Sequence, residues 1–116
     1  MTRDQAVTYC LSKPGAWLDN PWGEQDTVVK VGDKIFCFLG GADVPLGLGA
    51  KNSRERVEEW RARYPDHIGP APYLHKQMWS KIDLSGPDGP DDDEARELID
   101  DSYSLVVASL PRAKRP

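Results

Sequence analysis

The chain has 116 residues, of which 39% are hydrophobic and 29% charged, and its formal net charge is −4. This size and composition are typical of one globular domain that needs no disulfide or structural metal, and they exclude an intrinsically disordered protein. No apolar run approaches the roughly 20 residues that span a bilayer, so we expect a protein without membrane contact.

The cysteines and the first residues indicate a compartment. Cys10 and Cys37 lie inside predicted elements and lack C-x-x-C spacing, which favours buried free thiols over a disulfide. Residues 1–5 have no hydrophobic signal core. We therefore expect a cytoplasmic protein.

The first half of the chain predicts one helix followed by strands. Thr2 and Gln5 form a capping-box pattern at the start of a helix over residues 2–12. Gly32-Asp33 separates two β-branched and aromatic runs, which predicts a tight hairpin. A later strand contains Pro45 and alternating glycines, so we expect it at a sheet edge or with a bulge. The strands are expected at residues 16–18, 27–31, 34–39 and 44–48.

The second half predicts two more helices around short strands. Asn52 and Ser53 are both good N-caps for a helix over residues 53–63, and Glu55 completes a capping box with Asn52. Extended pieces are expected at residues 73–74 and 80–84, and a long amphipathic helix at residues 92–110. Without alternating βαβ units, this order predicts an α+β fold with a mostly antiparallel sheet and the helices packed on one face. We expect one domain over residues 1–111 and a frayed basic tail over residues 112–116.

Several short motifs, taken in order, carry a resemblance over nearly the whole chain. They are Pro21-Trp22-Gly23, Gly32-Asp33-Lys34-Ile35-Phe36, Pro72-Tyr73-Leu74 with Lys76 and Trp79, Leu98-Ile99-Asp100-Asp101-Ser102-Tyr103, and Leu110-Pro111. Together they resemble the MmcQ/YjbR family. The resemblance implies a small bacterial cytoplasmic protein with a frataxin-like (CyaY-like) α+β fold, described as a double wing and proposed to bind DNA. It also implies a structural motif made of Trp22, Phe36, Trp79 and Tyr103.

The segment Pro70–Trp79 concentrates aromatic and basic side chains. A frequent family form of its centre is Asn-Lys-Lys-His-Trp, whereas this chain has His75, Lys76, Gln77, Met78 and Trp79, which removes one cation and one histidine. Tyr73 and Trp79 suit stacking on a base, with Lys76 on a phosphate. Alternatively, Trp79 is a core residue and Lys76 a solvated turn residue.

Two other basic regions are candidates for contacting DNA. Lys30 and Lys34 flank the hairpin tip, where they suit either a DNA-binding wing or protection of a sheet edge. Lys51, Arg54, Arg61 and Arg63 lie on or just before the helix over residues 53–63, where intrahelical pairing with glutamates is the other explanation. Residues 83–101 hold nine acids and one base, and residues 1–82 hold eleven bases and ten acids, so bulk charge does not predict a broad basic face.

The remaining polar residues do not predict catalysis. Asp91–Glu94 fit a helix N-terminus better than a calcium loop. His67 and His75 lack metal-ligand spacing, and no nucleophile motif is present. We therefore expect a non-catalytic monomer without metal or cofactor. Its expected ligand is duplex DNA, contacted by Lys30, Lys34, Lys51, Arg54, Arg61, Arg63, Tyr73, His75 and Lys76. The alternative is a protein or small ligand in a Tyr73–Trp79 groove.

Overall fold

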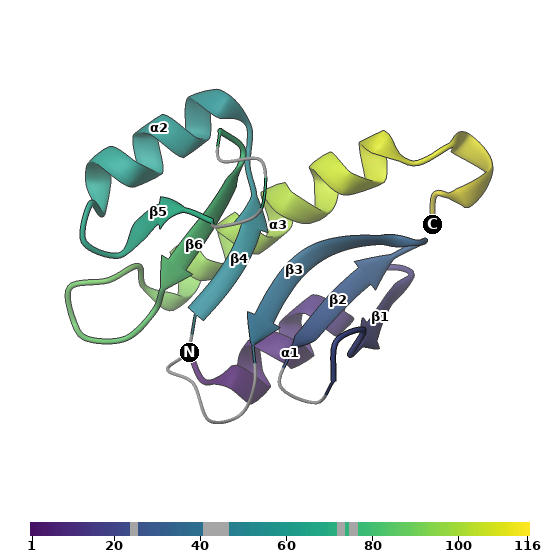
Figure 1. Ribbon diagram of the computed structural model, residues 1–116, viewed down its shortest axis with the longest axis horizontal. Helices are drawn as coiled ribbons and strands as arrows, with labels where there is room; N and C mark the ends of the chain where they lie inside the picture. The colour runs from purple at the N-terminus through teal and green to yellow at the C-terminus, as the bar shows by residue number, and fades with distance from the viewer. Residues whose placement is uncertain (24–25, 41–46, 72–73, 75–76) are drawn as a thin grey trace.

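The computed structural model describes residues 1–23, 26–40, 47–71, 74 and 77–116. Its elements, drawn in Figure 1, are α1 (Arg3–Leu11), β1 (Ala16–Asp19), β2 (Thr27–Val31), β3 (Lys34–Gly40), β4 (Gly47–Lys51), α2 (Arg54–Arg63), β5 (Ile68–Pro70), β6 (Trp79–Asp83), α3 (Asp92–Ser109) and the 3-10 helix η1 (Arg112–Lys114).

The strands form one antiparallel sheet in the order β1-β2-β3-β4-β6-β5. The predicted α+β class and the β2–β3 hairpin are confirmed. The expectation that the glycine-containing strand lies at an edge or carries a bulge is wrong, because β4 lies between β3 and β6 and pairs with β6 in unbroken register. Pro45, on which that expectation partly depended, lies outside the described residues.

The three helices cover one face of the sheet, as predicted. Figure 1 shows α1 and α3 on the same side, behind the strands in this view. Tyr9 Oη on α1 donates to Asp100 Oδ1 on α3 at 2.6 Å, and Tyr64 Oη, just after α2, donates to Glu94 Oε1 at 2.6 Å. Between sheet and helices lies the core, whose fully buried side chains include Val29, Phe36, Leu48, Ile82, Leu98 and Ile99.

A serine of α3 joins β3 to β4 where their pairing ends. The β2–β3 register shifts between Val29 and Lys30, which leaves Phe36 as an extra residue of β3. Ser102 Oγ donates to the Phe36 carbonyl at 2.5 Å and accepts from the Lys51 N–H at 2.8 Å. The hydroxyl therefore replaces a ladder hydrogen bond beyond the last pair, Cys37 with Ala50.

The caps of the three helices agree with the sequence except for the box expected at Asn52. Thr2 caps α1 and Asp91 caps α3, each in a complete capping box. For α2, the predicted alternative Ser53 holds the cap position, without a side-chain hydrogen bond, and the Asn52–Glu55 capping box is wrong. Asn52 is buried instead, and its Nδ2 donates to Asp101 Oδ2 at 2.9 Å. A buried amide needs partners more strongly than an exposed helix end does, because water can satisfy the helix end.

Two further sequence expectations concern the thiols and the tail. Cys10 and Cys37 are free and buried, as predicted. Residues 112–116, expected to fray, contain η1, and Arg115 Nη2 donates to the Ala108 carbonyl at 2.9 Å. Arg115 Nε also donates to the Leu110 carbonyl at 3.0 Å, so the tail folds back on the end of α3. Within the described residues, no helix has the length and apolarity that crossing a bilayer requires.

Candidate functional site

The sheet face opposite the helices, hereafter the open face, is identified by the strand register. Cys37 lies opposite Ala50, Ala50 lies opposite Ser80, and all three are buried on the helix-covered side. Side chains alternate along a strand, so the neighbouring cross-strand row points the other way. That row consists of Phe38, Gly49, Lys81 and Gly69.

Three aromatic rings meet on the open face. The rings of Trp22 and Phe38 stack with centroids 6.3 Å apart and planes within 6°, and Trp79 meets Phe38 edge-on at 5.5 Å. Trp22 lies after β1 and is 63% exposed, whereas Phe38 and Trp79 are half-buried. Large aromatic side chains usually bury most of their surface, so such an exposed indole is a candidate contact for a ligand.

Glycines keep the rest of the row flat. A Cβ at Gly49 would lie 3.0 Å from Phe38 Cβ, so the Phe38 side chain lies directly against the Gly49 backbone. A Cβ at Gly69 would meet no atom within 4 Å. In the part of the chain that the structure describes, the sheet is therefore uncovered beside Lys81.

A second exposed indole lies on β1. Trp17 is 42% exposed, its Nε1 donates to the Gly32 carbonyl at 2.8 Å, and Lys30 Nζ lies 5.1 Å from its ring centroid. Lys30 Nζ also lies 2.8 Å from Asp19 Oδ2. The hydrogen bond from Lys30 lowers the pKa of Asp19, so this carboxylate stays ionised and offsets the Lys30 charge.

Two more lysines lie on this face: Lys81 within the row and Lys51 beside it. Lys51 lies opposite Trp79, and Lys81 is exposed between Gly49 and Gly69. Neither lysine has an ion pair to another described residue. The nearby Asp83 accepts hydrogen bonds from the side chain and backbone of Ser85, which lower its pKa, and the charges of His67 and Lys81 lower it further. The open face thus combines rings, glycines and two cations available to an anionic ligand.

The hairpin tip points elsewhere. Lys34 Nζ donates to Ser109 Oγ at 3.2 Å at the end of α3, and Asp33 lies 3.8 Å from Lys114 Nζ. A Cβ at Gly32 would lie 3.2 Å from Leu110. The tip is therefore packed against the C-terminal end of α3, and Lys34 lies apart from Lys30.

The arginines of α2 form a separate group. Arg61 Nη2 donates to the Trp79 carbonyl at 3.1 Å and to Ser80 Oγ at 3.2 Å, and burial lowers the pKa of Arg61. Arg63 lies 3.5 Å from Glu94 Oε2, and Arg54 is exposed. These contacts face the helix-covered side, so the predicted basic residues do not share one surface.

The remaining predicted residues divide between described and undescribed positions. Tyr73, His75 and Lys76 lie outside the described residues, so three of the seven positions of the proposed Tyr73–Trp79 groove are not described. The interpretation of Trp79 as a core residue is wrong, because Trp79 contacts Phe38 on the open face. Phe36 is buried and meets Tyr103 edge-on at 5.2 Å.

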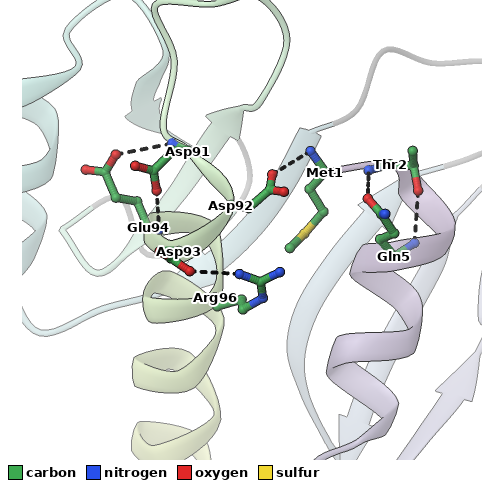
Figure 2. A network of polar contacts seen from close by, with 8 residues as sticks. All are labelled: Met1, Thr2, Gln5, Asp91, Asp92, Asp93, Glu94 and Arg96. Carbon is green, nitrogen blue, oxygen red and sulfur yellow. Dashed lines mark hydrogen bonds and ion pairs between the residues drawn. The ribbon is translucent and has the colours of Figure 1, made fainter.

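The acidic start of α3 has the predicted capping role, shown in Figure 2. Asp91 Oδ1 accepts from the Glu94 N–H at 2.8 Å, and Glu94 Oε1 accepts from the Asp91 N–H at 3.2 Å. Asp92 Oδ1 lies 2.7 Å from the Met1 ammonium, and Asp93 accepts from Arg96 at 2.9 Å. Each acid therefore has a local partner. Over the described ranges, no three potential metal ligands gather.

The sequence did not single out four residues of the open face: Trp17, Phe38, Lys81 and Gly69. Their grouping depends on strand register and on the extra residue at Phe36, which the sequence does not specify. One available signal was the presence of two tryptophans, Trp17 and Trp22, five residues apart in a short polar stretch.

Fold and face together define a class: a small α+β protein with one helix-covered and one open sheet face. The family model YjbR matches residues 11–105. The chain is 32% identical to protein YjbR of Escherichia coli K12 over 117 aligned positions, which cover 99% of this chain and 95% of that protein. The chain therefore belongs to the YjbR family.

Solved structures agree with this assignment. The crystal structure of Deinococcus radiodurans protein DR2400, of family-model domain DUF419, superposes with a TM-score of 0.87 at 29% identity, covering 97% of this chain and 84% of that one. A Pseudomonas syringae protein superposes with a TM-score of 0.70 at 26% identity, covering 90% of this chain and 98% of that one.

Proposed function

We propose that this protein is a non-catalytic nucleic-acid-binding module and that the open face is its binding surface. The supporting observation is the exposure of Trp17 and Trp22 on a sheet face that also carries lysines. Aromatic rings stack on bases while nearby cations contact phosphates, and this combination serves nucleic-acid binding on other sheet surfaces. The buried free thiols fit a reducing cytoplasm as its place of action.

The charge distribution supports an anionic ligand on this side. Lys51 and Lys81 border the ring cluster, whereas the acids of α3 pair with Met1, Arg96 and capped backbone amides away from it. Lys30 contributes less because Asp19 neutralises it. Since only two cations are available among the described residues, stacking supplies most of the affinity.

The test is fluorescence anisotropy with labelled mixed-sequence oligonucleotides, single-stranded and duplex, at about 50 mM salt, where phosphate contacts are strong. Trp22→Ala and Lys81→Gln should each weaken binding. Leu11→Ala is the matched control, because Leu11 is also an exposed apolar residue (39%) but lies on α1. Absence of binding to every oligonucleotide at low salt would refute the proposal.

A further inference from the structure

We infer that the ligand of the open face is single-stranded nucleic acid, in DNA or RNA form, and not a duplex. This inference deepens the proposed function and depends on it. It follows from three observations: the packing of the hairpin tip, the stacking geometry of Trp22, and the small number of available cations.

The hairpin tip is unsuited to enter a duplex groove. A two-stranded ribbon reads the major groove only when its tip and side chains are free to enter it. Here the Trp17 indole donates to the Gly32 carbonyl, and Lys34 donates to Ser109. Insertion into a groove would have to displace both contacts and the packing of Leu110 against Gly32.

The ring cluster suits unpaired bases. Trp22 and Phe38 are nearly parallel, so a base placed on the solvent side of Trp22 continues an existing stack. Trp79 supports the stack from the other side through its edge-on contact with Phe38. Bases in a duplex already stack on one another and cannot offer their faces to an indole, whereas unpaired bases can.

The cations also favour a single strand. Duplex binding proteins gain most of their affinity from many phosphate contacts, and the described open face has two available lysines, Lys51 and Lys81. With about 0.7 counterions released per single-strand phosphate, two contacts predict a log–log salt slope of about −1.4. Raising salt from 50 to 200 mM should then weaken binding only about sevenfold.

The closing experiment compares one sequence as a single strand of about 12 nucleotides, as DNA and as RNA, with its duplex. We expect the single strands to bind at least about tenfold more tightly, a difference that one stacked base can supply. Trp22→Ala should weaken single-strand binding about 5- to 160-fold, and Trp22→Phe should restore much of the loss. The affinities of the DNA strand and the RNA strand, measured separately, show which of the two nucleic acids the open face prefers.

Lys34→Gln is the matched control for the lysines, because Lys34 lies at the hairpin tip. It should leave single-strand affinity unchanged, whereas Lys81→Gln should weaken it and flatten the salt slope. Equal or tighter duplex binding, or a Lys34→Gln loss as large as that of Lys81→Gln, would overturn the single-strand inference while leaving nucleic-acid binding intact. Binding of neither form at low salt would refute the proposed function itself, and a protein ligand for the open face would then be the remaining class.

Discussion

Ser102→Ala tests whether the α3 hydroxyl holds β3 and β4 together. Ser102 is fully buried, and its Oγ satisfies both the Phe36 carbonyl and the Lys51 N–H. Removing it leaves two buried backbone groups without that partner, at about 1–3 kcal/mol each. Alanine is the better helix former by about 0.5 kcal/mol, which offsets a small part of the loss. We therefore expect a net destabilisation of about 1.5–5.5 kcal/mol, a large share of the roughly 5–15 kcal/mol typical of a domain.

The assay is urea unfolding followed by tryptophan fluorescence and far-UV circular dichroism, with thermal unfolding as a second measure. A loss of this size should lower Tm by about 6–22 °C in a domain of this length. Ser104→Ala is the matched control: it changes an exposed serine on the same helix, and its effect should stay within about 0.5 kcal/mol. A loss below about 1 kcal/mol for Ser102→Ala would show that the two backbone groups find other partners. The two hydrogen bonds of Ser102 Oγ would then contribute little to the stability of the fold.

Three further predictions concern packing and titration. Gly49→Ala should destabilise the fold by about 1 kcal/mol in the same urea assay, because its Cβ would press on Phe38 Cβ; unchanged or increased stability would refute this. The hydrogen bond from Tyr64 to a carboxylate of α3 raises the pKa of Tyr64 above 10.0 in the folded state. The stability that this bond gives the fold is therefore complete below pH 10.0 and is lost as the pH rises through the pKa of folded Tyr64. Tyr64→Phe should flatten the alkaline part of a stability–pH curve, and a parallel curve would contradict this. Contact with Cys10 is the larger cause, and burial the smaller one, of a Cys37 pKa well above its ordinary value. Ellman's reagent should therefore label the native thiols only at the rate of local opening. Prompt labelling without denaturant would be inconsistent with the buried pair.

Local signals in the sequence predicted most elements because neighbouring residues decide them. The Thr2–Gln5 capping box begins α1, and Gly32, at φ 61°, makes the tight turn of the hairpin. The apolar stripe of α3 placed Leu98 and Val106 in the core. In each case the interaction that forms the element lies within a few residues of sequence.

Tertiary partners decided what the sequence did not predict. β5 has three residues, too few for a recognisable alternation, and exists through pairing with β6. Asn52 was a good cap by type, but the Asp101 carboxylate across the core uses its amide. Which side chains lie on the open face depends on the strand register, because the extra residue at Phe36 directs Phe38 away from the helices. No local sequence pattern predicts such a register shift.

The two outer strands have a consequence for how partners can be recognised. β1 has four residues, and β5 has three, the last of which is Pro70 with no N–H to donate. Short edge strands, one of which ends in a proline, discourage the addition of a foreign strand and, with it, sheet-to-sheet aggregation. Backbone pairing is therefore a poor route to specificity at the described edges. Specificity for a partner would therefore depend on the side chains that the interior strands present on the open face.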